Sequence, residues 1–317
     1  MPPSLLQAPT RVVQSSFVDS TRWERYRPRD GDIIIGTYPK CGTTWVQHIV
    51  GMLIFRSAAP RDITQVSPWL DMKRFGDQPL AAIEAQTHRR FLKTHLPLDA
   101  VPVYQGVKFI HVARDGRDAA MSLHNHVRHY NDAFRAQLDR PASESDTGSG
   151  SGNGLIKGPV PGDPAAFFSD WVAAGGSRGN PDESFFQVTN SYWAARDNPD
   201  MLLVHFNDLK ADLGGEMRRI AAYLGITISE ALWPELIAAA GFSVMKEQGD
   251  LLLPIAQQVW DRGASRFFNC GTNNRWREIF APDDLARYEQ LVAQRFTPDQ
   301  ARWIAYGRLA ESAMDSH

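Results

Sequence analysis

Short apolar runs alternate along the chain with segments in which apolar residues recur at helical spacing. We interpret the apolar runs as buried strands; they lie at residues 32–36, 91–92, 108–113 and 201–206. The helical patterns lie at residues 43–55, 116–127, 165–173, 183–196, 213–224, 229–239, 282–296 and 298–309. This alternation predicts an α/β fold with a central parallel β-sheet flanked by helices.

Two segments lack such patterns. Residues 1–31 predict an irregular N-terminal arm that docks on the rest of the chain, with Trp23 and Tyr26 as its anchors. Residues 140–164 are rich in Gly, Ser and Pro, a composition that buries too little apolar surface to offset the entropy of ordering. They predict a flexible loop, which fits either a disordered surface segment or a mobile lid over a pocket. No repeat or boundary is evident elsewhere, so residues 1–317 are expected to form one domain.

Composition narrows the class of protein. The 317 residues are 43% hydrophobic, enough for a sizeable core, and the net charge of −2 gives no global attraction for nucleic acid or an anionic membrane. The two cysteines, Cys41 and Cys270, form no C-x-x-C pair and imply neither a disulfide framework nor a zinc site. No signal peptide is evident, and no segment approaches the roughly 18 apolar residues of a spanning helix. We therefore expect a cytoplasmic protein.

The first strand and helix are joined by the sequence Thr-Tyr-Pro-Lys-Cys-Gly-Thr-Thr-Trp, residues 37–45. Such a loop directs backbone N–H groups and a helix N-terminus at one point, which suits a phosphate. Lys40 adds a cation there, and Thr43 and Thr44 add hydroxyl donors. The alternative is an ordinary capped turn, which the joint occurrence of these residues disfavours. It is not a Walker A loop, because Lys40 precedes Gly42 and no acidic Mg²⁺ site is evident nearby.

This P-loop-like segment closely resembles the 5′-phosphosulfate loop of the cytosolic sulfotransferases, and the chain is identified as a bacterial-like member of that family. These enzymes use 3′-phosphoadenosine 5′-phosphosulfate (PAPS) as donor and release adenosine 3′,5′-bisphosphate (PAP). The resemblance implies that the donor is bound by Lys40, Cys41, Gly42, Thr43, Thr44 and Trp45.

A histidine follows the second predicted strand in the segment Lys93-Thr94-His95-Leu96-Pro97. Open α/β sheets place their chemistry at the C-terminal ends of strands. A lone histidine is more often structural, but this segment resembles the family's general-base segment residue by residue. The resemblance implies that His95 is the catalytic base and that Lys40 and Lys93 stabilise the charge that develops during transfer.

The third predicted strand leads into Val-Ala-Arg-Asp-Gly-Arg-Asp-Ala-Ala-Met-Ser, residues 112–122. This pattern resembles the family's 3′-phosphate site, which implies that Arg114 and Ser122 grip the ribose phosphate. Arginine suits the task because its planar fork can pair phosphate oxygens bidentately. The alternative is a surface ion pair for Arg114 and an ordinary helix hydroxyl for Ser122.

Other family segments are matched only in part. Phe206 stands where the family has an adenine-contacting Tyr, and Phe242 is a candidate adenine partner for Trp45. Asn269, Cys270 and Gly271 align with the family's Arg-Lys-Gly, so two cations of the 3′-phosphate site are missing. Nearby candidates to replace them are Arg266, Arg275 and Arg277. The family's dimer segment would overlap residues 277–286 and is not matched, which leaves the oligomeric state open.

Two further clusters keep two readings each. The favoured reading of His124, His126 and His129 is a cluster that faces solvent or the acceptor. The less favoured reading is a metal site, because no carboxylate or cysteine completes it locally. The aromatic and apolar residues Trp69, Leu70 and Phe75 either line the acceptor pocket or pack under a surface loop.

The expected reaction is an in-line transfer of a sulfuryl group from PAPS to the hydroxyl or amine of a small molecule, such as a phenol, alcohol or amine, without a metal. The expected partners do not include nucleic acid or membrane. Two alternatives remain, a non-catalytic nucleotide-binding protein of the same fold and a nucleotide kinase. The kinase would need Mg²⁺ ligands and a Walker lysine, and neither is visible in the sequence.

Overall fold

The computed structural model describes residues 3–15, 17–73, 78–138, 160–177 and 180–310. Most of the loop expected at residues 140–164 lies outside the described residues, as does Phe75. The described part of that loop, residues 160–164, leads directly into helix α6.

The centre of the molecule is a parallel sheet of four strands in the order β3-β2-β5-β6. The strands are β2 (Ile33–Thr37), β3 (Phe91–Thr94), β5 (Lys108–Ala113) and β6 (Met201–His205). All residues of β2 are buried, because a parallel sheet is covered on both faces. That explains why these strands read as continuous apolar runs, and the predicted α/β fold is confirmed.

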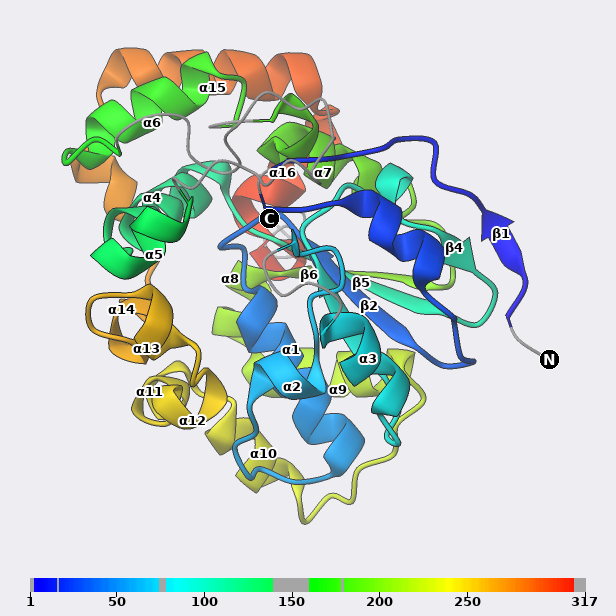
Figure 1. Ribbon diagram of the computed structural model, residues 1–317. Helices are drawn as coiled ribbons and strands as arrows, with labels where there is room; N and C mark the ends of the chain where they lie inside the picture. The colour runs from blue at the N-terminus through cyan, green and yellow to red at the C-terminus, as the bar shows by residue number, and fades with distance from the viewer. Residues whose placement is uncertain (1–2, 16, 74–77, 139–159, 178–179, 311–317) are drawn as a thin grey trace.

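Helices cover both faces of the sheet (Figure 1). Helices α1 (Thr43–Phe55) and α9 (Leu213–Tyr223) lie on one side, and α7 (Phe185–Trp193) and α16 (Pro298–Tyr306) lie on the other. On the second side Tyr192 stacks on His111 of β5 at 4.5 Å between ring centroids. Trp303 of α16 meets His205 of β6 edge-to-face at 5.4 Å. The C-terminal helix therefore seals the sheet beside its last strand.

The N-terminal segment lies along the edge of the domain. Its strand β1 (Leu5–Gln7) pairs with β4 (Val103–Tyr104) in a small antiparallel sheet that the sequence pattern did not predict. A 3₁₀ helix, η1 (Ser20–Arg25), follows. Trp23 and Tyr26 are both buried, and the Tyr26 hydroxyl donates to Asp32 at 2.5 Å.

The remaining helices are mostly short. They are α2 (Ile63–Val66), α3 (Gln78–Ala85), η3 (Leu98–Ala100), α4 (Gly116–Arg128), α5 (Asp132–Leu138), α6 (Pro164–Ala173), η4 (Pro181–Glu183), α8 (Phe206–Ala211), α10 (Trp233–Ala239), α11 (Phe242–Glu247), α12 (Gly249–Leu252), α13 (Ala256–Val259), α14 (Ala264–Phe267), η5 (Arg275–Glu278) and α15 (Pro282–Arg295). Helix α10 begins later than the expected residue 229, with Pro234 in its first turn. Helices α11 to α14 are too short to produce a readable helical period.

The strand register decides where chemistry can occur. Gly36 of β2 lies beside Thr94 of β3 and His111 of β5, and Ala113 of β5 lies beside His205 of β6. All these strands run in the same direction, so the segments that follow them emerge at a single edge of the sheet. That edge is where open α/β sheets bind ligands.

Candidate active site

A cavity of about 780 Å³ opens at this edge of the sheet. Its walls come from the segments that follow β2, β3, β5 and β6, together with α11, α14 and the loop before η5. The site residues expected from the sequence that line it are Lys40, Gly42, Thr43, Thr44, Trp45, Lys93, His95, Arg114, Ser122, Phe206, Phe242, Asn269, Cys270 and Gly271. One edge of the fold thus brings together residues that are more than 200 positions apart in the sequence.

Cys41 is the exception among the expected donor-binding residues. Its side chain is buried and does not line the cavity, and Sγ lies 3.9 Å from the Pro39 carbonyl oxygen. Burial raises the pKa of the Cys41 thiol to about 12, so the thiol is neutral. The side chain fills space behind the loop, which leaves the backbone as the part of Cys41 that could face a ligand.

The loop after β2 has an unusual backbone. Lys40 has φ 69°, a left-handed conformation that few non-glycine residues adopt. Gly42 has φ 114°, and a Cβ there would lie 3.1 Å from the Phe206 ring. Strained backbone of this kind is typical of ligand-binding loops. Helix α1 begins at Thr43, whose hydroxyl lies 2.6 Å from the Thr37 hydroxyl.

Two lysines enter the centre of the cavity and both have lowered pKa values. The Lys40 Nζ lies 4.1 Å above the Phe267 ring and 3.3 Å from His126 Nδ1. Burial, followed by the charges of Lys93 and Arg114, lowers the pKa of Lys40 to about 7. Burial lowers the pKa of Lys93 to about 8, although Asp71 acts in the opposite direction. An anion beside these lysines would favour their charged forms.

His95 follows β3 and shares this centre. Its Nδ1 lies 2.8 Å from the Thr37 carbonyl oxygen, which only accepts hydrogen bonds, so Nδ1 carries the proton and Nε2 is left as the basic atom. Its ring meets Trp69 edge-to-face at 4.8 Å. Burial, then the charges of Lys93 and Lys40, hold the pKa of His95 well below its usual value. The imidazole is therefore neutral.

Arg114 follows β5 and is held by the loop that precedes η5. Its guanidinium donates to the Asn273 side-chain oxygen at 3.0 and 2.6 Å, to the Thr272 carbonyl at 3.0 Å and to the Lys40 carbonyl at 3.3 Å. It also lies 4.2 Å above the Phe206 ring. Arg114 therefore ties together the segments that follow β2, β5 and β6.

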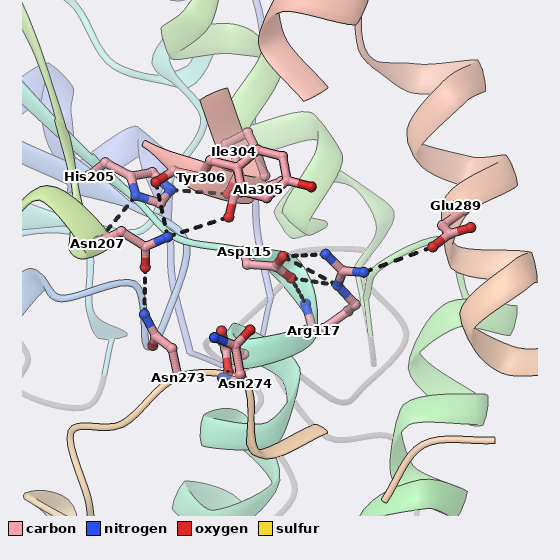
Figure 2. A network of polar contacts seen from close by, with 11 residues as sticks. Asp115, Arg117, His205, Asn207, Asn273, Asn274, Glu289, Ile304, Ala305 and Tyr306 are labelled. Atoms are coloured by element: carbon pink, nitrogen blue, oxygen red, sulfur yellow. Dashed lines mark hydrogen bonds and ion pairs between the residues drawn. The ribbon is translucent and has the colours of Figure 1, made fainter. Parts of the chain in front are cut away.

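The loop that holds Arg114 is fixed in turn to the C-terminal helix (Figure 2). Asn273 donates to Asn207 at 2.5 Å, and Asn207 donates to the Tyr306 carbonyl at 3.1 Å. On its other side, the Asn274 backbone N–H donates to Asp118 at 2.8 Å. This network positions the segment that carries the departures from the family's Arg-Lys-Gly.

The aromatic residues form the wall beyond Arg114. Trp45 meets Phe206 edge-to-face at 5.3 Å and donates its indole N–H to the Ala240 carbonyl at 2.8 Å. Phe242 lies against Gly271, where a Cβ would come within 2.7 Å of the ring. Position 271 therefore requires glycine, because a Cβ would clash with the Phe242 ring and because a φ of 63° is left-handed.

Of the three arginines considered as replacements for the missing cations, Arg275 lines the cavity. Its positive charge contributes to lowering the pKa of Arg114, after the larger effect of burial. Arg266 instead pairs with Asp261 at 3.0 Å, and Arg277 lies 5.1 Å from the Trp276 ring centroid.

The rest of the cavity is mostly apolar, with polar side chains contributed by Gln47, Thr64, Gln65, Ser67 and Gln78. Trp69 lines it, as expected from one reading of the sequence, but Leu70 is part of the core. The other apolar walls include Phe17, Ile63, Met72, Tyr130, Phe134, Leu253, Ile255, Val259, Trp260 and Phe267. Of the three histidines, His126 lines this cavity, while His124 and His129 line a second one of about 680 Å³. Within the described residues, no group of three or more His, Cys, Asp or Glu could hold a metal ion.

Comparison with known proteins identifies the family. The family model described as the sulfotransferase domain matches residues 30–298. A glycolipid sulfotransferase of Mycobacterium bovis (strain BCG / Pasteur 1173P2) is 31% identical over 320 residues, which cover 94% of each protein. This chain belongs to the sulfotransferase family.

Other relatives of this sulfotransferase include sulfotransferase 1B1 of Mus musculus, which is 26% identical over 89% of each protein. Among solved structures, mouse sulfotransferase SULT7A1 complexed with PAP matches with a TM-score of 0.68 at 20% identity, covering 98% of this chain and 100% of the other. Retinol dehydratase in complex with retinol and PAP matches with a TM-score of 0.66 at 21% identity, covering 88% and 84%. These structures share the fold. In the described residues of the sulfotransferase, no helix is both long and apolar enough to span a membrane.

Sequence reasoning missed several residues at the site of the sulfotransferase. Lys246 donates to the Asn269 carbonyl at 2.7 Å and Lys210 donates to the Gly271 carbonyl at 3.2 Å, so two cations approach the loop that lacks its own. Asp71 accepts a hydrogen bond from the Trp69 indole, and its charge acts on Lys93. Lys210 lies in α8, which follows β6, but none of the three stands at the end of a strand, where site residues are expected from the sequence.

Proposed function

We propose that this sulfotransferase moves a sulfuryl group from PAPS to the hydroxyl of a neutral, largely apolar small molecule. The observation that carries the proposal is the meeting of Lys40, Lys93 and His95 at one point of the cavity. All three residues line the same cavity, where the Trp69 ring contacts the His95 ring at 4.8 Å and Lys93 Nζ at 4.1 Å. The charges of both lysines act on His95.

The donor side of the cavity fits the anionic groups of PAPS. The loop at residues 40–44 would hold the 5′-phosphosulfate through backbone N–H groups and the hydroxyls of Thr43 and Thr44. Arg114, Ser122 and Arg275 would face the 3′-phosphate, and Trp45, Phe206 and Phe242 would enclose the adenine. Two proteins with the same fold were solved with PAP bound, which supports PAPS as the donor. PAPS supplies the sulfuryl group, whose bond to the 5′-phosphate oxygen breaks as the acceptor oxygen bonds to sulfur.

His95 acts as the general base. Its Nε2 takes the proton of the acceptor hydroxyl, since Nδ1–H is bonded to the Thr37 carbonyl. Burial, and then the charges of Lys93 and Lys40, make His95 a weak base. The anionic charge of the donor would offset the charges of the two lysines and raise the pKa of His95, so His95 is a better base when the donor is present.

Lys40 and Lys93 stabilise the negative charge that grows on the bridging and sulfuryl oxygens. Fixed cations in a buried site act strongly because little water screens them. Their lowered pKa values show that burial opposes the charged forms in the free protein. The site is therefore complementary to an anion, and it needs no metal for charge neutralisation.

The lining of the cavity favours a neutral acceptor. Among the described residues, Asp118 is the only carboxylate on its walls, and it lies on the donor side near Arg114. A protonated alkylamine would find no counter-charge beside the reaction centre and would be repelled by Lys40 and Lys93. We therefore favour phenols and alcohols with an apolar body over alkylamines.

The test is a transfer assay with labelled PAPS and matched panels of phenols, alkanols and alkylamines, run with and without EDTA. We expect label on hydroxyl acceptors, none on alkylamines, and no effect of EDTA. His95→Asn should lower turnover by about 10²–10⁴-fold and change PAP affinity less than about threefold. Absence of transfer to every hydroxyl acceptor would refute the proposal, and loss of transfer with EDTA would indicate a metal-dependent reaction. Equal turnover in the variant would remove His95 from the mechanism.

A further inference from the structure

Behind the reaction centre lies a carboxylate that the mechanism above does not use. Asp71 is fully buried, in the segment that runs beside β3. Its Oδ1 accepts from the Trp69 indole N–H at 2.5 Å. Its Oδ2 accepts from the Trp23 indole N–H at 3.0 Å and from the Thr94 hydroxyl at 2.6 Å. The Thr94 hydroxyl already accepts from the Leu96 N–H at 3.0 Å, so its own proton points at Asp71.

The three hydrogen-bond donors around Asp71 explain why this position has a carboxylate rather than an amide side chain. Three donors converge on its two oxygens, and an ionised carboxylate is an acceptor only. An asparagine of the same shape would turn an amide N–H group toward one of the donors. The side chain therefore matches its surroundings only as a carboxylate.

The carboxylate is coupled to the reaction centre through Trp69. The Trp69 ring meets His95 edge-to-face at 4.8 Å, and Lys93 Nζ lies 4.1 Å above the same ring. The backbone supports this contact, because the Lys93 N–H donates to the Pro68 carbonyl at 3.0 Å. Fixing the indole N–H therefore fixes the surface against which both His95 and Lys93 are packed.

We infer that Asp71 is a positioning residue of the sulfuryl-transfer centre, which holds Trp69 against His95 and Lys93. The inference rests on the proposed roles of His95 and Lys93. Within the described residues, Asp71 is the only acid that acts on the charge of Lys93. Burial would otherwise discharge this lysine more completely.

The test compares Asp71→Asn with Asp32→Asn as a matched control. Asp32 is equally buried and bonded, to Arg90 and Tyr26, but it precedes β2 at the opposite end of the sheet. Both variants should lower the melting temperature. Asp71→Asn should also lower kcat by about 10–100-fold, by analogy with the loss of a partner that orients a metal-ligating side chain. The control should keep kcat within about twofold, and PAP affinity should change less than about threefold in both.

A second readout separates positioning from general damage. Without the Asp71 charge, the pKa of Lys93 falls further, so the alkaline limb of the kcat profile should move to lower pH by about one unit. Lys40 and His95 titrate in the same centre, and Glu183 and Tyr192 also experience the Asp71 charge, so the control profile is recorded alongside. Trp69→Phe removes the indole N–H but keeps Asp71 and an aromatic ring, and should lower kcat while moving the alkaline limb less than Asp71→Asn does.

The outcomes are distinct. If wild-type protein transfers sulfuryl groups and Asp71→Asn matches Asp32→Asn in kcat and pH profile, the inference is overturned. If Asp71→Asn does not fold, Trp69→Phe decides, and wild-type kcat in that variant overturns the positioning role. If wild-type protein shows no transfer with any hydroxyl acceptor, the proposed function fails instead.

Discussion

Replacement of Arg114 by alanine tests whether the protein recognises the 3′-phosphate of its nucleotide ligand. A guanidinium has five N–H donors. Within the described residues, Arg114 commits four of them, two to Asn273, one to Thr272 and one to Lys40. One N–H is left, so the bidentate grip expected from the sequence would require release of the long 3.3 Å bond to the Lys40 carbonyl.

This count sets the size of the effect. One charge-assisted hydrogen bond is worth about 1.5–3 kcal/mol, or about 10–150-fold in affinity. Arg275 is exposed and has a cavity-facing position, so its contribution should be smaller, about two- to fivefold, and should weaken with added salt. We expect Arg114→Ala to lose PAP affinity by the larger factor and Arg275→Ala by the smaller one.

The assay is calorimetric titration of PAP and of adenosine 5′-monophosphate, which lacks the 3′-phosphate, into wild type and variants. Wild type should prefer PAP, and Arg114→Ala should lose most of that preference while its affinity for the monophosphate falls less than about threefold. Arg277→Ala is the matched control, because Arg277 is in the same short helix as Arg275 but does not line the cavity. Equal losses for both ligands would show that Arg114 only supports the loop at Thr272 and Asn273. Equal affinities in wild type would mean that the 3′-phosphate is not read.

Two further predictions concern the reaction centre. The pKa of His95 should rise when PAP binds, because the bisphosphate offsets the charges of Lys40 and Lys93. The pKa can be measured by NMR titration of the histidines in the presence of PAP, with adenosine as the control ligand. Titration curves of His95 that coincide for PAP and adenosine would contradict the prediction. His126→Phe should increase PAP affinity by up to about fivefold, because Lys40 would no longer have to break its hydrogen bond to His126, worth about 1 kcal/mol, before it binds the anion. A lower PAP affinity of the variant in calorimetric titration would refute this reasoning.

Much of the reaction centre could be predicted from the sequence, because a parallel sheet places the residues that follow its strands at one edge. Strands buried on both faces leave apolar runs, and the residues that follow them share one edge. His95, Arg114 and Phe206 each follow such a strand directly, so their meeting was predictable. Their individual chemical roles came from resemblance to the family and stay predictions.

Other features had no readable signal. Asp71 lies between α2 and α3, in a stretch that prolines interrupt, and two of its three partners, Trp23 and Thr94, come from other segments. Lys210 and Lys246 reach the loop at residues 269–271 only because short helices bring them there. For Cys41, a motif could not distinguish a side-chain role from a backbone role, and the fold turns its thiol away from the cavity.

The buried lysines connect the binding of the donor to the chemistry. Burial lowers the pKa of Lys40 to about 7 and that of Lys93 to about 8, which disfavours the charged forms of both lysines. An anionic donor favours their charged forms and at the same time makes protonation of His95 less unfavourable. One binding event would thus prepare both the cations that stabilise the transferred group and the base that receives the acceptor's proton. We therefore expect an acceptor hydroxyl to be activated in the presence of the donor and to remain unactivated without it.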